Sequence, residues 1–391
     1  KMTQYINQAI KEKSSLSTAP LPGWLFEIDA FYTEQGAYSP QMSAYQPRSQ
    51  LPVYKRQFFT DRVIKEIAHP TPVIFENEGV RLWHLQDDVA VVSFKSKANT
   101  IGQSVLDGLE AAIETAEKQC RGLIIYQQDA NNFCSGADLR GVLNLIKDNK
   151  MQALDDMIAQ FQRVALRLKY SPIPTVAALR GRALGGGCEL MMHCDAVIAA
   201  FEAYPGLVEF GVGLIPAGGG CKEMAMRAAH LAPKGDLMTV LQSYYQQIAT
   251  AQVASSAADA MQMGYLRSTD SYVMHADEVL YVALAKINLM HAENYLPPLK
   301  KQFQIAGIEG KARLQAGLVN WLEGGFISQH DYFIATELAA VLCGGNLNQN
   351  TFVDEHWMLK LEREAFITLA ASPLTQARIS HLLETGKPLR N

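Results

Sequence analysis

The 391-residue sequence has no long apolar run and little excess charge of either sign. No stretch reaches the roughly 18 consecutive apolar residues that a membrane-spanning helix requires, so we expect no membrane span. The chain has 35 lysines and arginines against 39 aspartates and glutamates, and its net charge of -4 predicts no general attraction to nucleic acid. The first residues, KMTQYINQAIKEKSS, are polar and predict no signal peptide, which favours a cytoplasmic protein.

Metal-binding and nucleotide-binding signatures are also missing. The six cysteines include no Cys-x-x-Cys pair, which predicts free thiols in a reducing compartment. The nine histidines show no spacing such as His-Glu-x-x-His, so we expect no metal ion. No Gly-x-Gly-x-x-Gly follows a predicted strand and no Gly-Lys-Ser/Thr loop occurs, which argues against a dinucleotide or nucleotide site.

Short apolar segments alternate with helical patterns in the middle of the chain. Residues 89–94, 122–126, 175–179 and 196–200 are rich in β-branched and other apolar residues and are predicted as buried strands. Between them, helical spacing predicts one helix capped by Ser104 and a long helix over residues 148–168. This alternation predicts an α/β domain with a mainly parallel sheet.

Beyond Gly220 the periodicity becomes helical. We predict helices over residues 255–263, 275–294, 311–322, 329–342 and 354–369. A final helix is predicted from the residues at its ends, with Ser372 as the N-cap, Pro373 in the first turn and Gly386 as the residue that ends it.

Three consecutive glycines, Gly185, Gly186 and Gly187, precede one helix-like segment. Backbone amides without side chains at such a position can point at a developing negative charge, although a tight strand-to-helix turn would explain the glycines as well. Glu189 follows two residues later and Glu209 twenty residues after that, and two carboxylates in apolar surroundings suggest acid/base chemistry. Taken alone, Glu189 could serve the helix dipole and Glu209 could be an ordinary loop residue.

Two neighbouring patterns have simpler structural explanations. Cys188, His193 and Asp195 suggest a thiol triad, but their apolar neighbours and ordinary helical spacing favour core packing. Asp138, in the segment SGADL, is expected to cap the helix that follows it.

The segment NNFCSGADLR, the glycine triplet and the two glutamates together resemble the crotonase (enoyl-CoA hydratase/isomerase) superfamily. The resemblance covers roughly residues 89–220 and implies a crotonase-like α/β fold, a spiral of ββα units, here with a helical C-terminal extension. It also implies an oxyanion hole made by the backbone amides of Ala137 and Gly186. By the same resemblance, Glu189 and Glu209 are the catalytic pair.

The presence of both glutamates favours hydration of 2-enoyl-CoA to 3-hydroxyacyl-CoA in fatty-acid β-oxidation. The resemblance implies that Glu189 activates water and that Glu209 supplies a proton, with no metal or redox cofactor. Enoyl-CoA isomerisation by Glu209 alone and a non-catalytic acyl-CoA-binding or assembly module remain the alternatives. The expected substrate and coenzyme A contacts are Lys97, Ala98, Ser135, Gly136, Asp138, Leu139, Arg140, Gly185 and Gly187.

The two ends of the chain differ from a stand-alone hydratase. LPGWLFEIDAFY resembles the end of the C-terminal domain of 3-hydroxyacyl-CoA dehydrogenases, and the last thirty or so residues resemble those of bacterial fusion proteins with the dehydrogenase first. We therefore expect residues 1–70, with a short helix at 55–67, to be the remnant of an upstream dehydrogenase domain. The expected parts that follow are a hydratase core at 71–270 and a helical region at 271–391.

This assignment makes a dehydrogenase domain or subunit the expected protein partner. NAD would serve only that dehydrogenase, because its nucleotide-binding glycines are missing from this chain. A first residue, Lys1, that is not methionine also fits a piece of a longer protein. Finally, the resemblance implies self-association into a homo-oligomer.

Overall fold

The chain divides into two compact units, Lys1–Pro70 and Thr71–Asn391. The structure is a computed structural model and describes residues 22–28, 30–33, 35–47, 50–56, 72–127, 132–232 and 237–391. A helix was predicted at 55–67, and residues 57–67 of it lie outside the described residues. The described helix α2 (Pro52–Lys55) ends at the first residue of that prediction. The assignment of residues 1–70 to a dehydrogenase remnant, of 71–270 to a hydratase core and of 271–391 to a helical region stays a prediction.

The first unit contains a small antiparallel sheet of β1 (Tyr32–Thr33), β2 (Gly36–Ser39) and β3 (Ala44–Gln46), preceded by a 3₁₀ turn at Gly23–Phe26. The ring of Trp24 stacks on Tyr38 with 5.7 Å between centroids. The Tyr45 hydroxyl donates to the carbonyl of Ala30 at 2.6 Å. Aromatic packing thus holds the described part of this unit together.

The second unit is built on a seven-stranded sheet in the order β10-β9-β8-β7-β6-β5-β4. Its strands are β4 (Val73–Glu76), β5 (Val80–His84), β6 (Val89–Phe94), β7 (Gly122–Ile125), β8 (Thr175–Leu184), β9 (Ala196–Gly206) and β10 (Ser271–Val273). Strands β6 to β10 run parallel, as the alternating pattern predicted, and the four predicted strands are confirmed.

The sheet differs from the prediction at one edge, where β4 and β5 pair antiparallel. They form a hairpin whose turn is stabilised by Asn77, because its Oδ1 accepts from the amides of Gly79 at 2.9 Å and Val80 at 2.8 Å. The sheet is therefore mixed, and the sequence analysis missed this hairpin.

Two strands also run further than predicted. Strand β8 continues past Leu179 because Gly181, at φ +61°, allows a register shift in its pairing with β9. This extension to Leu184 brings the strand directly to the glycine triplet. Strand β9 continues to Gly206, and in this extension Ala203 is buried between exposed Glu202 and partly buried Tyr204.

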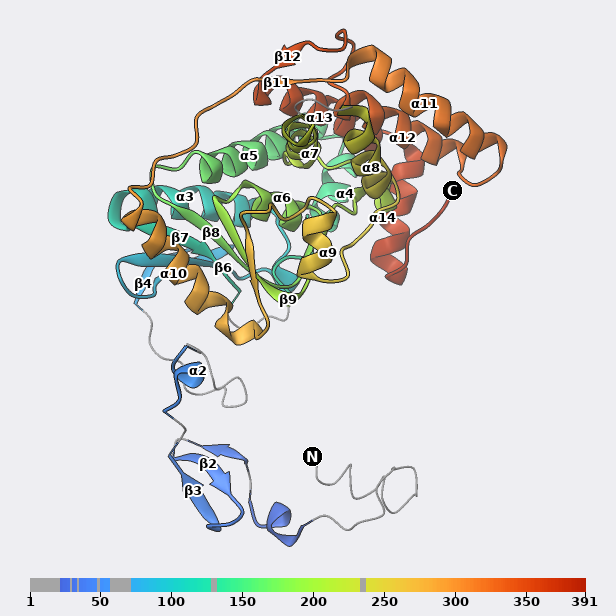
Figure 1. Ribbon diagram of the computed structural model, residues 1–391. Helices are drawn as coiled ribbons and strands as arrows, with labels where there is room; N and C mark the ends of the chain where they lie inside the picture. The colour runs from blue at the N-terminus through green and yellow to red at the C-terminus, as the bar shows by residue number, and fades with distance from the viewer. Residues whose placement is uncertain are drawn as a thin grey trace. The chain divides into compact units, whose positions relative to one another are not determined.

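Helices cover both faces of the sheet. They are α3 (Gln103–Gln119), α4 (Leu139–Lys147), α5 (Met151–Lys169), α6 (Gly186–His193), α7 (Gly220–Leu231), α8 (Leu237–Ala249), α9 (Ala257–Gln262) and α10 (Val279–Ala292). In β7, Leu123 and Ile125 belong to the main core with α3, whereas Ile124 points to the opposite face, where α10 packs. Figure 1 shows α10 and α3 on different sides of the sheet.

Two helix predictions need correction. Helix α3 is capped by Gly102 and not by Ser104, because the amides of Val105 and Leu106 already donate to the Gly102 carbonyl. The helix predicted at 148–168 begins at Met151 as α5 and is preceded by a separate helix, α4. The chain breaks between them at Asn149, whose φ of +56° is incompatible with a continuous helix.

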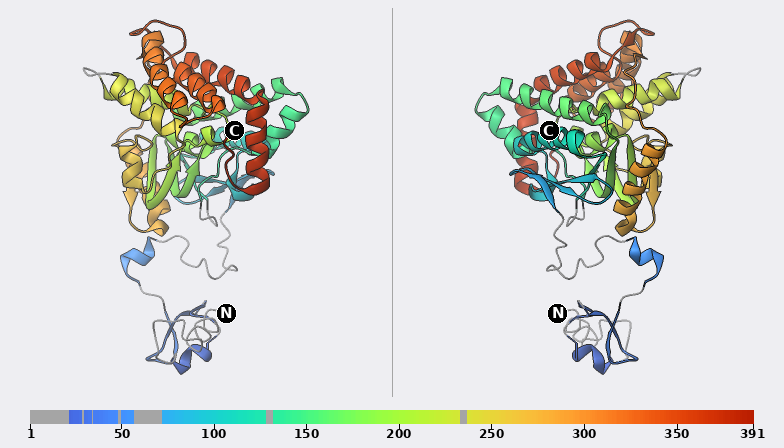
Figure 2. Two further views of the ribbon diagram at one scale, coloured as in Figure 1. Left: turned by 90° about the vertical axis from the view of Figure 1, so that its right-hand side faces the viewer. Right: turned by 90° about the vertical axis from the view of Figure 1, so that its left-hand side faces the viewer.

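The C-terminal region contains α11 (Gly307–Glu323), α12 (Gln329–Leu342), α13 (Glu355–Ala370) and α14 (Pro373–Thr385), with a short ladder of β11 (Phe303–Gln304) and β12 (Phe352–Val353). The predicted helices are confirmed. Helix α13 packs on α5 and α7, and α12 packs on α7 and α8. Figures 1 and 2 show these helices, in orange and red, stacked over the central helices. Among the described residues, no helix is long and apolar enough to cross a membrane.

Candidate active site

The loop that contains Ala137 lies against the N-terminus of α6. Leu184 N donates to the carbonyl of Cys134 at 2.9 Å, and Ile101 pairs with Ala137 as an isolated bridge. A Cβ atom on Gly187 would come within 2.5 Å of the Cys134 Cβ, so glycine is required for this close approach. The extension of β8 leads into this region, and Ala137 and Gly186 both line one cavity.

Gly186 is the first residue of α6, where the helix itself offers the backbone amide no acceptor. The preceding Gly185 has φ +52° and ψ -123°, a conformation open to glycine alone at low cost. Its own amide is bonded to the Gly206 carbonyl at 2.8 Å. The turn thus presents the Gly186 amide to the adjacent cavity, where the helix dipole also favours negative charge.

Glu189 lies one turn into α6 and is 2% exposed. Its Oε1 accepts from the amides of Gly218 at 2.8 Å and Gly220 at 2.7 Å. Burial raises the pKa of Glu189, the two amides lower it, and the balance puts the pKa at about 7. A carboxylate with such a pKa is suited to take up a proton near neutral pH.

Glu209 begins the 3₁₀ helix η3 (Glu209–Val212). Its Oε2 is buried and has no hydrogen-bond partner among the described residues. Burial raises the pKa of Glu209 well above its ordinary value, and the negative charge of Glu189 raises it further. An unpaired buried carboxylate oxygen is costly, so the protonated form of Glu209 is favoured.

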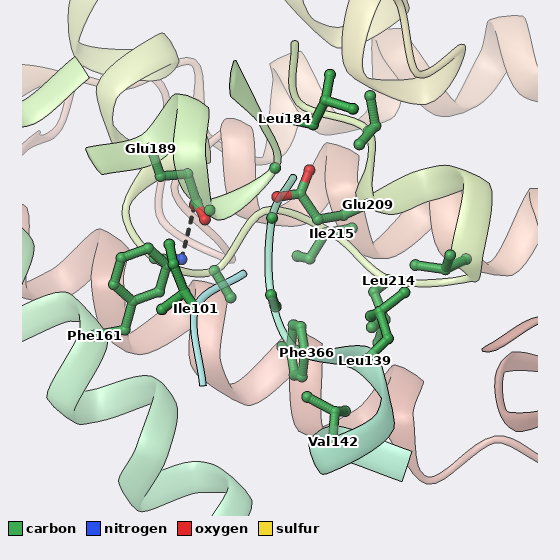
Figure 3. A pocket seen from close by; sticks show the side chains of 18 of the residues that line it. Ile101, Leu139, Val142, Phe161, Leu184, Glu189, Glu209, Leu214, Ile215 and Phe366 are labelled. Atoms are coloured by element: carbon green, nitrogen blue, oxygen red, sulfur yellow. Dashed lines mark hydrogen bonds between the residues drawn. The ribbon is translucent and has the colours of Figure 1, made fainter. Parts of the chain in front are cut away.

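Both glutamates line one cavity of about 370 Å³. Figure 3 shows Glu189 and Glu209 on opposite sides of it, with Phe161 and Ile101 beside Glu189. The remaining wall is mostly apolar and includes Leu139, Val142, Val212, Leu214 and Ile215. The C-terminal region completes the wall with Phe366 of α13, Leu382 of α14 and Pro388. Two carboxyl groups therefore meet in a largely apolar cavity that two distant parts of the chain enclose.

The sequence analysis missed a third buried carboxyl group, Glu362 of α13, which is 0% exposed. Its oxygens accept from Gly219 N at 2.9 Å and Lys222 N at 2.6 Å. These amides belong to the same turn as the Gly218 and Gly220 amides that donate to Glu189. Burial raises the pKa of Glu362, as does the charge of Glu189. A glutamate within the apolar stripe of α13, between Met358, Leu359, Ala365 and Phe366, was the available signal.

The structural reading of Cys188, His193 and Asp195 is confirmed. Each contacts other groups. The Cys188 thiol donates to Met192 Sδ at 3.9 Å, and Asp195 accepts from Thr175 and Tyr295. His193 Nδ1 lies 2.7 Å from the Glu189 carbonyl oxygen, and its Nε2 lies 2.8 Å from Lys222 Nζ. Burial lowers the pKa of His193 to about 3, and the Lys222 charge lowers it further. Neutral His193 therefore supports the backbone of Glu189. All six cysteines are unpaired, as predicted.

The expected coenzyme A contacts are only partly brought to the cavity wall. Ser135, Gly136, Leu139 and Gly185 line the cavity together with Ala137. The other expected contacts, Lys97, Ala98, Asp138, Arg140 and Gly187, are not part of the wall.

Ala98 nevertheless adjoins this site, because its carbonyl accepts from Ser135 N at 3.3 Å. Asp138 caps α4 through Arg140 N at 3.2 Å, as its structural reading predicted. Among the residues that the structure describes, no cluster of three or more potential metal ligands occurs.

Comparison with known proteins finds a family match and several relatives. Residues 84–267 match the family described as Enoyl-CoA hydratase/isomerase. The chain is 36% identical over 386 residues to the "Probable 3-hydroxyacyl-CoA dehydrogenase" of Bacillus subtilis, which covers 97% of this chain and 48% of that protein. It is 33% identical over 152 residues to the fatty acid oxidation complex subunit alpha of Idiomarina loihiensis, which covers 38% of this chain and 21% of that one. This chain thus spans about half the length of these relatives, or less.

Solved structures show the same fold. The crystal structure of an enoyl-CoA hydratase from Bacillus halodurans superposes with a TM-score of 0.53 at 18% identity, covering 78% of this chain and 99% of that chain. The expected crotonase-like α/β fold with C-terminal helices is confirmed. The relatives also connect the chain to fatty-acid oxidation enzymes.

Proposed function

We propose that the chain hydrates 2-enoyl-CoA thioesters to 3-hydroxyacyl-CoA, starting from the match of residues 84–267 to the enoyl-CoA hydratase/isomerase family. The observation that carries the proposal is the pairing of Glu189 and Glu209 across one apolar cavity, each with a raised pKa. A family member that only moves a double bond would need one of these groups.

The thioester oxygen would lie between the amides of Ala137 and Gly186. When water adds to the β-carbon, electrons move through the alkene onto this oxygen, and negative charge develops there. Donors that are already in place in a site without bulk water can each stabilise such charge by about 3 kcal/mol. The positive end of α6 adds to the same effect.

The two glutamates would divide the proton transfers. Glu189, whose ionised form accepts from two amides, takes a proton from water as the oxygen attacks the β-carbon. Glu209, kept protonated by burial and by the Glu189 charge, gives its proton to the α-carbon. Net addition of water leaves Glu189 protonated and Glu209 ionised, and return of one proton resets the pair.

The rest of the assignment follows as part of the same proposal. Ser135, Gly136, Leu139 and Gly185 would contact the substrate at the wall, and Lys97, Ala98, Asp138, Arg140 and Gly187 would lie nearer the coenzyme A portion. Residues 1–70 would be the end of a dehydrogenase domain that oxidises the 3-hydroxyacyl-CoA product. The name of the Bacillus subtilis relative, of which this chain matches 48%, supports that arrangement.

The test is the loss of the conjugated enoyl-thioester absorbance when the full chain is added to crotonyl-CoA. A 3-enoyl-CoA is the parallel substrate, because an isomerase would generate the conjugated absorbance from it. Hydration of crotonyl-CoA supports the proposal. Isomerisation without hydration would assign the chain to the other activity, and coenzyme A ester binding without turnover of either substrate would make it an assembly or binding module.

A further inference from the structure

A second cavity, of about 600 Å³, lies next to the catalytic one. The two cavities share three lining residues, Gly211, Ala251 and Pro388. Gly211 belongs to the short helix η3 that begins with Glu209, so the junction is two residues from the proposed proton donor. Two of these shared residues, Gly211 and Ala251, are small and place little bulk at the junction.

The wall of the second cavity is supplied largely by the C-terminal region. The apolar residues that this region supplies are Leu318, Trp321, Phe326, Ile327, Ala335, Pro388 and Leu389, and Phe210, Ala249 and Ala251 complete the apolar wall. Phe326 is 77% exposed, a large value for an aromatic side chain beside a cavity. Such exposed apolar surface favours an apolar occupant.

Apart from Arg390, which is exposed, the polar side chains of this wall are already paired with protein atoms. Arg378, which is 2% exposed, donates to Asp331 Oδ1 at 2.8 Å and to Asn391 Oδ1 at 2.8 Å. The Thr250 hydroxyl donates to the Gln246 carbonyl at 2.7 Å. These groups need no ligand, so the wall offers apolar contact in preference to hydrogen bonds.

We propose that the second cavity binds the distal hydrocarbon chain of long 2-enoyl-CoA substrates, which enters it from the catalytic cavity past Gly211. This inference rests on the proposed function and adds a substrate class to it. The reactive carbons must lie between Glu189 and Glu209, and the acyl chain continues beyond the β-carbon. An unbranched apolar chain matches both the continuity of the two cavities and the lining of the second.

Gly211 gives a direct way to close the junction. A Cβ atom at this position would meet nothing within 4 Å, and its φ is not in the left-handed region, so a larger side chain is tolerated and projects into open space. Gly211→Leu should obstruct the passage, whereas Gly211→Ala should leave it open. Gly317→Leu is the matched control, since a Cβ there also meets nothing within 4 Å and Gly317 lines neither cavity.

The experiment compares kcat/KM for dodecenoyl-CoA and crotonyl-CoA in the full chain. We expect Gly211→Leu to lower the ratio of the long to the short substrate more than tenfold, because the loss of two buried methylenes at ~0.8 kcal/mol each already corresponds to that factor. Leu389→Asp, which puts a carboxylate at the partly exposed far wall, should lower the same ratio. Gly211→Ala and Gly317→Leu should preserve it.

A binding measurement separates this inference from the proposed function. Binding of saturated dodecanoyl-CoA should change the fluorescence of Trp321, which butyryl-CoA should not do, and Trp321→Phe should remove the change. This signal is expected whether or not the chain turns over substrate. An unchanged ratio in Gly211→Leu, or an equal loss for both substrates, would overturn the inference while leaving hydration intact; equal loss would indicate that the coenzyme A arm passes this point.

Discussion

Glu189 and Glu209 have identical side chains in different environments. Two backbone amides bond to Glu189 and limit the rise of its pKa, whereas Glu209 has a buried oxygen without a partner and lies near the Glu189 charge. Two carboxyl groups whose pKa values are pushed apart can act as base and acid at the same pH. The backbone amides that can donate to each carboxyl oxygen therefore determine how the two pKa values differ.

This difference predicts a bell-shaped pH dependence of kcat/KM for crotonyl-CoA. Below pH ~7 the base Glu189 is protonated, so the rate should rise as the pH increases through about 7. It should fall again at higher pH, as Glu209 loses the proton it must donate. Stopped-flow or continuous absorbance assays give the profile, and a rate that decreases between pH 5 and 7 would contradict the assignment of Glu189 as the base.

The residue types of the site could be read from the sequence, but their partners could not. Gly185, Gly186, Glu189 and Glu209 stand out because glycines and carboxylates are unusual in an apolar segment. Glu362 was missed because it is more than 150 residues away along the chain, and its place in the apolar stripe of α13 does not say which group it bonds to. Only the packing of α13 on α7 makes it a neighbour of Glu189.

At the scale of single elements, local patterns predicted most of the helices and the parallel strands. Buried strands such as β6 can be predicted from a continuous apolar segment, because both of their faces are covered. The β4–β5 hairpin was not predicted, because its strands are short and partly exposed. The extension of β8 depends on a register shift at Gly181, and register is a property of two strands and not of one sequence segment.

The N-terminus of α7 is the element on which the site depends most. Four backbone amides at or beside it are divided between two carboxyl groups: Glu189 binds Gly218 and Gly220, and Glu362 binds Gly219 and Lys222. This turn therefore donates hydrogen bonds both to Glu189 of α6 and to Glu362 of the C-terminal region. Movement of this turn would displace Glu189 from the cavity.

Glu362→Leu should destabilise the chain by ~3 kcal/mol, because two buried amide donors lose their acceptor. Glu362→Gln is the matched control, since it retains one amide-bonding oxygen and nearly the same volume, and we expect a smaller loss of ~1 kcal/mol. Urea unfolding of the two variants and the wild type measures the difference. Equal stability of Glu362→Leu and the wild type would show that these hydrogen bonds do not hold α13 to α7.

On the scale of the whole second unit, the C-terminal helices complete the wall of the cavity that contains Glu189 and Glu209. They supply Phe366, Leu382 and Pro388 to the cavity wall, and Glu355 of α13 forms ion pairs with Lys222 at 2.6 Å and Lys169 at 2.9 Å. The sequence showed these helices but not where they pack, because amphipathic patterns identify a buried face without identifying what covers it.

The Glu355 ion pairs predict a pH-dependent stability. Burial alone would raise the pKa of Glu355, but the charges of Lys222 and Lys169 and the hydrogen bonds from Lys222 and Tyr170 outweigh it and lower the pKa from 4.5 to about 2. Because the pKa is lowered on folding, this contribution is present above pH ~4.5 and is lost as the pH falls toward 2.

Glu355→Gln should therefore lower the free energy of unfolding by about 3 kcal/mol at pH 7 and by much less at pH 3. Denaturant unfolding at the two pH values measures this change. Glu364→Gln is the control, because the pair of Glu364 with Lys360 is exposed and contributes little. An equal loss for Glu355→Gln at both pH values would contradict the docking role of the ion pairs.

The most direct test of the central claim is the rate of crotonyl-CoA hydration by the full chain beside Glu189→Gln and Glu209→Gln, with folding of each variant checked by circular dichroism. If both glutamates take part in water addition, each substitution should lower kcat by 10²- to 10⁴-fold, the usual contribution of a positioned acid or base. A Glu189→Gln variant that hydrates crotonyl-CoA at the wild-type rate would contradict the two-glutamate mechanism.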